Sequence, residues 1–147
     1  MKRLSIYCSF IFVIIFFTTL HAQDIETVYD YYDQNDMEDK YHLSQLAQRC
    51  AGVTGAYAKY LPQTMQDERK VLAEVSGKFV ELAGMMLLQK GMTDTNNIVR
   101  QVSTGFQFYV DNYYKQIEVT QLSTGSIFEG RVSSELIWCR DLYKQLN

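Results

Sequence analysis

The chain has 147 residues, of which 47% are hydrophobic and 14% aromatic, and it contains a single proline. This length and composition fit one helical domain that is large enough to bury a core. The net charge of −3, together with the lack of a stripe of Lys and Arg residues, argues against nucleic-acid binding, because phosphate groups must be neutralised by positive charge.

The first residues have the pattern of a secretory signal peptide. Lys2 and Arg3 precede an apolar run over residues 4–20, and Ala22 places a small residue at the expected cleavage site. Cleavage after Ala22 removes these two positive charges, so the net charge changes from −3 to −5. The alternative is an uncleaved anchor, since a run of about 17 residues is near the lower limit for crossing a bilayer. We expect residues 1–22 to be cleaved and the rest to be exported to the periplasm or the extracellular space, without stable membrane insertion.

Residues 23–38 form an acidic, tyrosine-rich leader that we expect to be flexible. The segment contains acidic residues but no Lys or Arg, which is typical of a solvated tail. Calcium binding is one alternative, although the segment lacks a twelve-residue loop with a central Gly and a terminal Glu. In the other alternative the leader docks on a basic partner or folds back on the domain, and Tyr29, Tyr31 and Tyr32 supply the contacts.

Residues 39–147 are expected to form a single domain, because four segments in this range have apolar residues at helical spacing. The first helix begins near residues 36–39 and ends at Leu61, because Pro62 disfavours helical geometry in the residue before it. The second is expected at about residues 65–90 and the third at about residues 94–119. The fourth follows a capping box formed by Ser126 and Glu129.

Cys50 and Cys139 are the two cysteines that remain after cleavage, and each lies in the middle of the apolar face of its helix. Export to an oxidising compartment favours a disulfide between them. The two residues would meet at the same level if the first and fourth helices were antiparallel neighbours. The predicted fold is therefore all-α, an up-down four-helix bundle stapled by Cys50 and Cys139.

Small residues form a stripe beside the apolar face of the first two helices. They are Ser44, Ala47, Ala51, Gly55 and Ala58 in the first helix and Ala73, Gly77 and Gly84 in the second. Such stripes let another helix approach closely. The close approach can be made within one chain or, alternatively, in a symmetric homodimer.

No catalytic or cofactor-binding motif is found, whether CxxCH, HExxH, a GxSxG elbow, a P-loop or GxGxxG. We interpret His42 as a surface residue and the methionines at 85, 86 and 92 as adaptable core residues rather than a soft metal site. The glutamates at 74, 81, 118 and 135 do not form the Glu-x-x-His pairs of a di-iron bundle. We therefore predict no enzymatic activity, no metal site and no cofactor.

The third helix contains a candidate contact for a partner. Phe108 falls about 200° around the helix from Phe106, which points to the core, and Tyr114 is also away from the centre of the core face. We therefore predict an exported, non-enzymatic binding or accessory protein that contacts another exported protein. One alternative is a carrier of a small apolar or haem-like ligand in the bundle core, and another is an enzyme of unrecognised type that uses Glu74 or His42.

Overall fold

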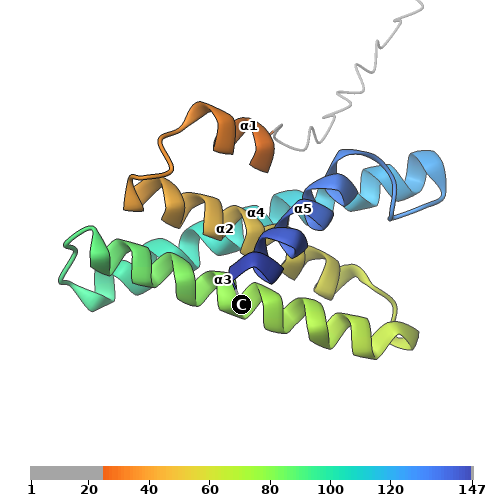
Figure 1. Ribbon diagram of the computed structural model, residues 1–147. Coiled ribbons are helices and arrows are strands. Elements are labelled where there is room, and N and C mark those ends of the chain that lie inside the picture. The colour runs from red at the N-terminus through yellow and green to blue at the C-terminus, as the bar shows by residue number, and fades with distance from the viewer. Residues whose placement is uncertain (1–24, 147) are drawn as a thin grey trace, which may run out of the picture.

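The computed structural model describes residues 25–146, so the predicted signal peptide lies outside the described residues. Within this range the fold is all-helical, as predicted (Figure 1). The elements are α1 (Val28–Gln34), α2 (Lys40–Tyr60), the short 3-10 helix η1 (Gln63–Met65), α3 (Gln66–Gln89), α4 (Thr95–Thr124) and α5 (Gly130–Leu146). Among the helices of residues 25–146, none is long and apolar enough to cross a membrane.

Polar side chains cap the N-termini of two of the long helices. The Asp39 carboxylate accepts a hydrogen bond from the Tyr41 N–H at the start of α2, and Asp94 accepts one from the Asn97 N–H at the start of α4. Gly125 ends α4 in the left-handed conformation, with a φ of 79°. The helix thus extends beyond the end predicted near residue 119, because no Gly or Pro lies between that residue and Gly125.

The start of α5 differs from the predicted capping box. The Ser126 hydroxyl accepts a hydrogen bond from the Phe128 N–H, two residues along the chain. The helix itself begins only at Gly130, which has a φ of 72°. The capping role predicted for Ser126 and Glu129 is therefore replaced by a local turn before the helix.

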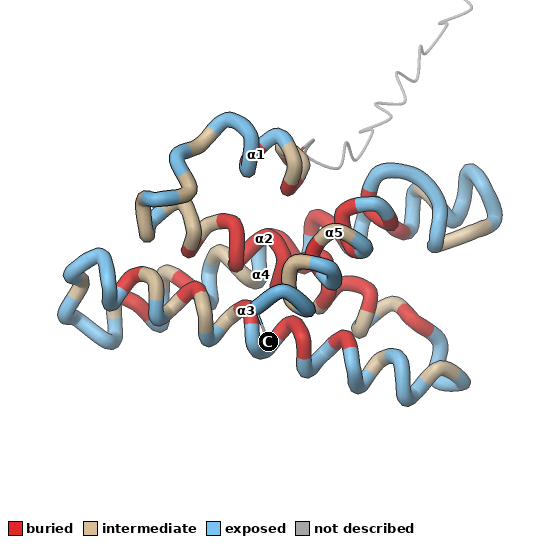
Figure 2. Tube along the Cα trace, in the orientation of Figure 1, coloured by how far each residue is buried: buried red, intermediate tan, exposed pale blue. Residues whose placement is uncertain are grey.

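The central helix is α2, which packs most extensively against α3 and α4 (Figures 1 and 2). Its middle is buried almost all the way round, from Leu46 to Thr54. A Cβ atom on Gly52 would overlap the Tyr109 side chain of α4, so the two helix backbones can approach only because Gly52 has no side chain. In the reverse direction, Gly105 of α4 makes room for the buried Gln48 side chain of α2.

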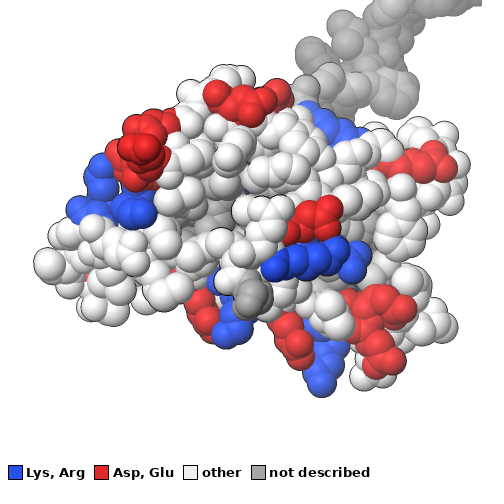
Figure 3. Space-filling view, in the orientation of Figure 1, with Lys and Arg blue, Asp and Glu red and all other residues white. Residues whose placement is uncertain are grey.

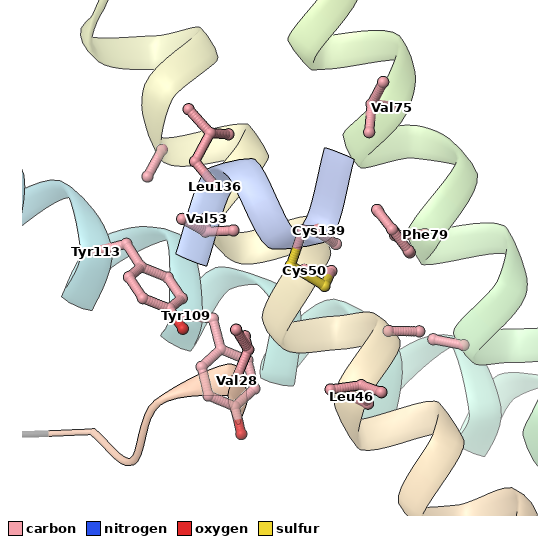
Figure 4. Close-up of a cluster of buried hydrophobic side chains, with 14 of the residues drawn as sticks. Val28, Leu46, Cys50, Val53, Val75, Phe79, Tyr109, Tyr113, Leu136 and Cys139 are labelled. Carbon is pink, nitrogen blue, oxygen red and sulfur yellow. A yellow bond between two sulfur atoms is a disulfide. The ribbon is translucent and has the colours of Figure 1, made fainter. Parts of the chain in front are cut away.

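The predicted disulfide is present and joins α2 to α5. The Cα atoms of Cys50 and Cys139 are 5.4 Å apart, and both residues are fully buried. Side chains from α2, α3, α4 and α5 surround the bond, among them Phe79 of α3 and Leu136 of α5 (Figure 4). The disulfide therefore lies in the main hydrophobic core.

The segment expected to be a flexible leader instead contains a short helix, α1, which the prediction of four helices did not include. Ile25, Val28 and Tyr31 recur every three residues and are all buried. The Thr27 hydroxyl accepts a hydrogen bond from the Asp30 N–H and begins the helix. The acidic composition of this segment indicated a solvated tail, but the three apolar residues form a short face that attaches α1 to the rest of the domain.

Candidate functional site

An apolar groove runs along the surface between α3 and α4. Its larger part has a volume of about 570 Å³. Its lining residues are Val80, Glu81, Gly84, Met85, Leu88, Thr95, Ile98, Val99, Val102, Ser103 and Phe106. A second hollow of about 340 Å³ shares Val80 and Phe106 and reaches Gly55 and Ala58 of α2. We call the two hollows together the α3–α4 groove.

The small residues of α3 line this groove instead of contacting another helix. A Cβ atom on Gly77 would meet nothing within 4 Å, and one on Gly84 would meet only Ile98, at 3.9 Å. Gly52 of α2 is different, because it allows the close approach of α4. A Cβ atom on Gly55, which belongs to the stripe on α2, would come within 3.2 Å of Val110 of α4. The tight helix pair that the sequence predicts is thus formed by α2, at Gly52 and Gly55, whereas the stripe on α3 faces open space.

Large apolar side chains surround the groove and remain in contact with solvent. Met85, Leu88 and Val99 are 50%, 53% and 62% exposed. Met85 is therefore not a core residue, contrary to the sequence prediction, while Met86 is partly buried. The charged residue in the lining is Glu81, which forms an ion pair with Lys78 at 2.9 Å. Apolar side chains gathered in a concave surface are characteristic of a binding site.

A buried carboxylate, Glu135, connects three helices. Its Oε2 atom accepts hydrogen bonds from the Val28 N–H of α1, at 3.0 Å, and from the Tyr113 hydroxyl of α4, at 2.6 Å. Its Oε1 atom is 3.4 Å from Nε of Arg131. Burial raises the pKa of this carboxyl group, and the two hydrogen bonds oppose that shift. Burial and the nearby Glu135 also hold the pKa of Tyr113 well above its usual value, so its hydroxyl remains a donor.

A second buried charge, Arg49 of α2, holds the chain just before α1. Its guanidinium donates hydrogen bonds to the Glu26 carbonyl at 2.7 Å and to the Glu26 carboxylate at 3.0 Å. The same group lies over the rings of Tyr31, at 4.3 Å, and Tyr109, at 5.1 Å. Arg49 and Glu135 thus bind backbone and side-chain groups of the N-terminal segment, and we interpret both as structural residues.

The aromatic residues predicted to contact a partner have different environments. Phe108 is exposed and packs edge-on against Tyr109, whereas Tyr114 is partly buried against Tyr60. Tyr29 and Tyr32 lie together on Trp138 of α5, with ring centroids 6.0 and 5.6 Å away. Tyr31 is buried, and its hydroxyl is 3.0 Å from Nδ1 of His42. The structure thus brings Tyr29 and Tyr32 together at the surface and places Tyr31 inside.

The two buried charges were not predicted from the sequence, although their positions in the helical pattern could have revealed them. Glu135 follows Val132 by three residues and precedes Cys139 by four, so it lies on the buried face of its helix. Arg49 has the same relation to Leu46 and Val53. A charged residue in such a position is buried only when other groups of the fold provide partners.

The described part of the chain contains no group of three or more His, Cys, Asp or Glu side chains that could hold a metal ion. Of the two residues considered for catalysis, His42 contacts the Tyr31 hydroxyl and Glu74 is exposed on α3. No known protein family, curated protein sequence or solved structure matches this chain.

Proposed function

We propose that this protein is an exported, non-enzymatic accessory protein that binds an amphipathic helix of another exported protein in the α3–α4 groove. The observation that carries the proposal is the exposure of Met85, Leu88 and Val99 around an apolar hollow of about 570 Å³. A helix with apolar residues on one face is a common occupant of such grooves. The glycines on α3 would let the backbone of that helix come close.

The energetic argument follows from the exposed apolar surface. Burying a large aliphatic side chain completely contributes about 1.5 to 3 kcal/mol. Since Met85, Leu88 and Val99 are each about half exposed, the partner would gain about 1 kcal/mol from each of them. Burial of the partner's own apolar side chains adds to this gain.

Export is part of the same proposal. Residues 1–22 have the pattern of a cleaved signal peptide, and an oxidising compartment would maintain the disulfide between Cys50 and Cys139. We also propose that α2 to α5 are arranged as an up-down bundle to which α1 is added. Mass spectrometry of the protein recovered from the exported fraction would test the cleavage site directly.

A second copy of the chain fits the groove less well than a different protein. In an antiparallel pair of α3 helices, Gly77 of one copy would face Gly84 of the other, which places Val80 and Glu81 at the two-fold axis. The two Glu81 carboxylates, each paired with its Lys78, would then lie side by side in an apolar interface, where burying charged groups is costly. We therefore favour a different protein as the partner.

Site-specific photo-crosslinking in cells tests the proposed binding site. A photoreactive residue is placed at Val99, which is 62% exposed in the groove, and for comparison at Val119, which is 57% exposed on the same helix but outside the groove lining. We expect crosslinks from position 99 to a helical segment of one exported protein, and none from position 119. Identical crosslinks from both positions, or none from position 99, would contradict the proposal.

A carrier of a small apolar ligand is the second candidate function. The groove volume of about 570 Å³ lies within the range of ligand pockets, and most of its lining residues are apolar. Native mass spectrometry distinguishes the two functions. A carrier would show the additional mass of a bound ligand, which should be absent from Val99→Glu and still present in Val119→Glu. The absence of any additional mass in the wild type would support the binding of a protein helix.

A further inference from the structure

The outward face of α1 and the loop after it carry an excess of negative charge. Figure 3 shows acidic side chains gathered over this part of the molecule. The exposed carboxylates are those of Asp30, Asp33, Asp36 and Glu38. Within the described residues none of the four forms an ion pair, whereas the neighbouring Asp39 is paired with Lys90 at 2.6 Å. In this part of the structure four exposed carboxylates are thus left without an ion pair, and only Asp30 and Asp36 accept hydrogen bonds, from Thr27 and from the Glu38 N–H.

Aromatic side chains lie beside these carboxylates. Tyr32 is 46% exposed, and Trp138 of α5 has the rings of Tyr29 and Tyr32 against it. Asp30 and Asp33 are three residues apart, as are Tyr29 and Tyr32, so the two pairs form adjacent stripes on α1. We call this combined surface the acidic aromatic face.

The rest of the domain holds this face in place. Val28 and Tyr31, on the opposite side of α1, are buried, and the Glu135 carboxylate accepts the Val28 N–H. Arg49 fixes the chain just before the helix through Glu26. A surface that is ordered before binding loses less conformational entropy in a complex, so modest contacts are sufficient for recognition.

We propose that the acidic aromatic face binds a basic protein segment in which Arg or Lys residues alternate with apolar residues. Arg pairs with carboxylates through two parallel hydrogen bonds and also stacks on Trp and Tyr rings. The apolar residues of the segment would cover Tyr29, Tyr32 and Trp138. Nucleic acid is excluded as a ligand because its phosphates would be repelled by the four carboxylates. The site is separate from the α3–α4 groove, since α1 and α3 lie on different sides of α2 (Figure 1).

Fluorescence provides a direct assay, because Trp138 is the single tryptophan of the chain. The purified protein is titrated with a capped octapeptide of alternating arginine and leucine, and calorimetry is run in parallel. We expect saturable binding that weakens as salt is added, since exposed charges are screened. The same peptide with glutamate in place of arginine should not bind, and octa-arginine should bind at least about fivefold more weakly because it lacks the apolar contacts.

Variants locate the site. We expect Asp30→Asn and Asp33→Asn each to weaken binding about two- to fivefold, as for exposed ion pairs, and Tyr32→Ser to weaken it by a similar factor. Asp67→Asn is the matched control, because Asp67 is an exposed carboxylate on α3 without an ion pair in the described structure, and it should leave the affinity unchanged. Circular dichroism verifies that every variant is folded. The proposal is overturned if neither fluorescence nor calorimetry detects saturable binding, if Asp67→Asn has the same effect as Asp33→Asn, or if octa-arginine binds equally well.

Discussion

Glu135 is the residue through which α5 most directly holds α1. Its Oε2 atom accepts hydrogen bonds from the Val28 N–H and the Tyr113 hydroxyl, and all three residues are buried. A buried donor that loses its acceptor costs about 1 to 3 kcal/mol. We therefore expect Glu135→Ala to lower the free energy of unfolding by about 2 to 5 kcal/mol in urea denaturation. Glu118→Ala, at an exposed glutamate of α4, should change it by less than about 0.5 kcal/mol. Equal losses in the two variants would contradict the structural role of Glu135.

The buried position of Glu135 also makes stability depend on pH. Burial raises the pKa of its carboxyl group above the ordinary value of 4.5, so the folded protein binds this proton more tightly than the unfolded chain does. The stability contributed by the proton is fully present below the unfolded pKa and is lost as the pH rises through the higher folded pKa. Glu135→Gln cannot titrate. The unfolding free energy is measured by urea titration of the wild type and of this variant at a series of pH values. We expect the value for the wild type, relative to that for the variant, to fall as the pH rises above the ordinary carboxyl pKa of 4.5. A relative stability that increases with pH would show that the hydrogen bonds outweigh burial.

At the scale of the elements, the contact between α2 and α4 depends on Gly52. A Cβ atom at this position would overlap the Tyr109 side chain and force the two helices apart. Because overpacking of a core costs about 1 to 3 kcal/mol, Gly52→Ala should lower the free energy of unfolding by that amount. Gly77→Ala should instead raise it by about 0.5 to 1 kcal/mol, since its Cβ would meet nothing within 4 Å and Ala is the better helix former. Urea denaturation measures both variants, and a loss of stability in both would show that packing is not the cause.

The four long helices could be predicted from the sequence because their signals are local. Pro62, for example, determines the end of α2 through the conformation that it disfavours in Leu61. Gly125 ends α4 in a similarly local way, although the end was predicted near residue 119. The short helix α1 could not be predicted in this way, because its partners are distant in the chain. Val28 and Glu135 are 107 residues apart. Helical spacing also shows that Gly77 and Gly84 share a face, but it does not show whether another helix covers that face, so the α3–α4 groove required the structure.

At the scale of the whole molecule, the elements depend on one another in a definite order. The helices α3 and α4 pack on α2, which is the most buried helix, and the disulfide joins α5 to α2. In turn α5 holds α1, because Glu135 and Trp138 both belong to α5. The disulfide could be predicted from the two cysteines and their positions in the helices. The role of the disulfide in supporting α1 could not be predicted, because α1 was not expected.

This order predicts the effect of reducing the disulfide between Cys50 and Cys139. The cysteines are separated by 89 residues, and loss of such a cross-link costs about 2 to 5 kcal/mol. We expect hydrogen exchange to become faster in α5, and to a smaller extent in α1, which keeps its contacts with Arg49. The middle of α2 and its contacts with α3 and α4 should remain protected. A Cys50→Ala and Cys139→Ala double variant should show the same exchange pattern with and without reductant. Uniformly faster exchange in all helices would show instead that the disulfide stabilises the whole domain as one cooperative unit.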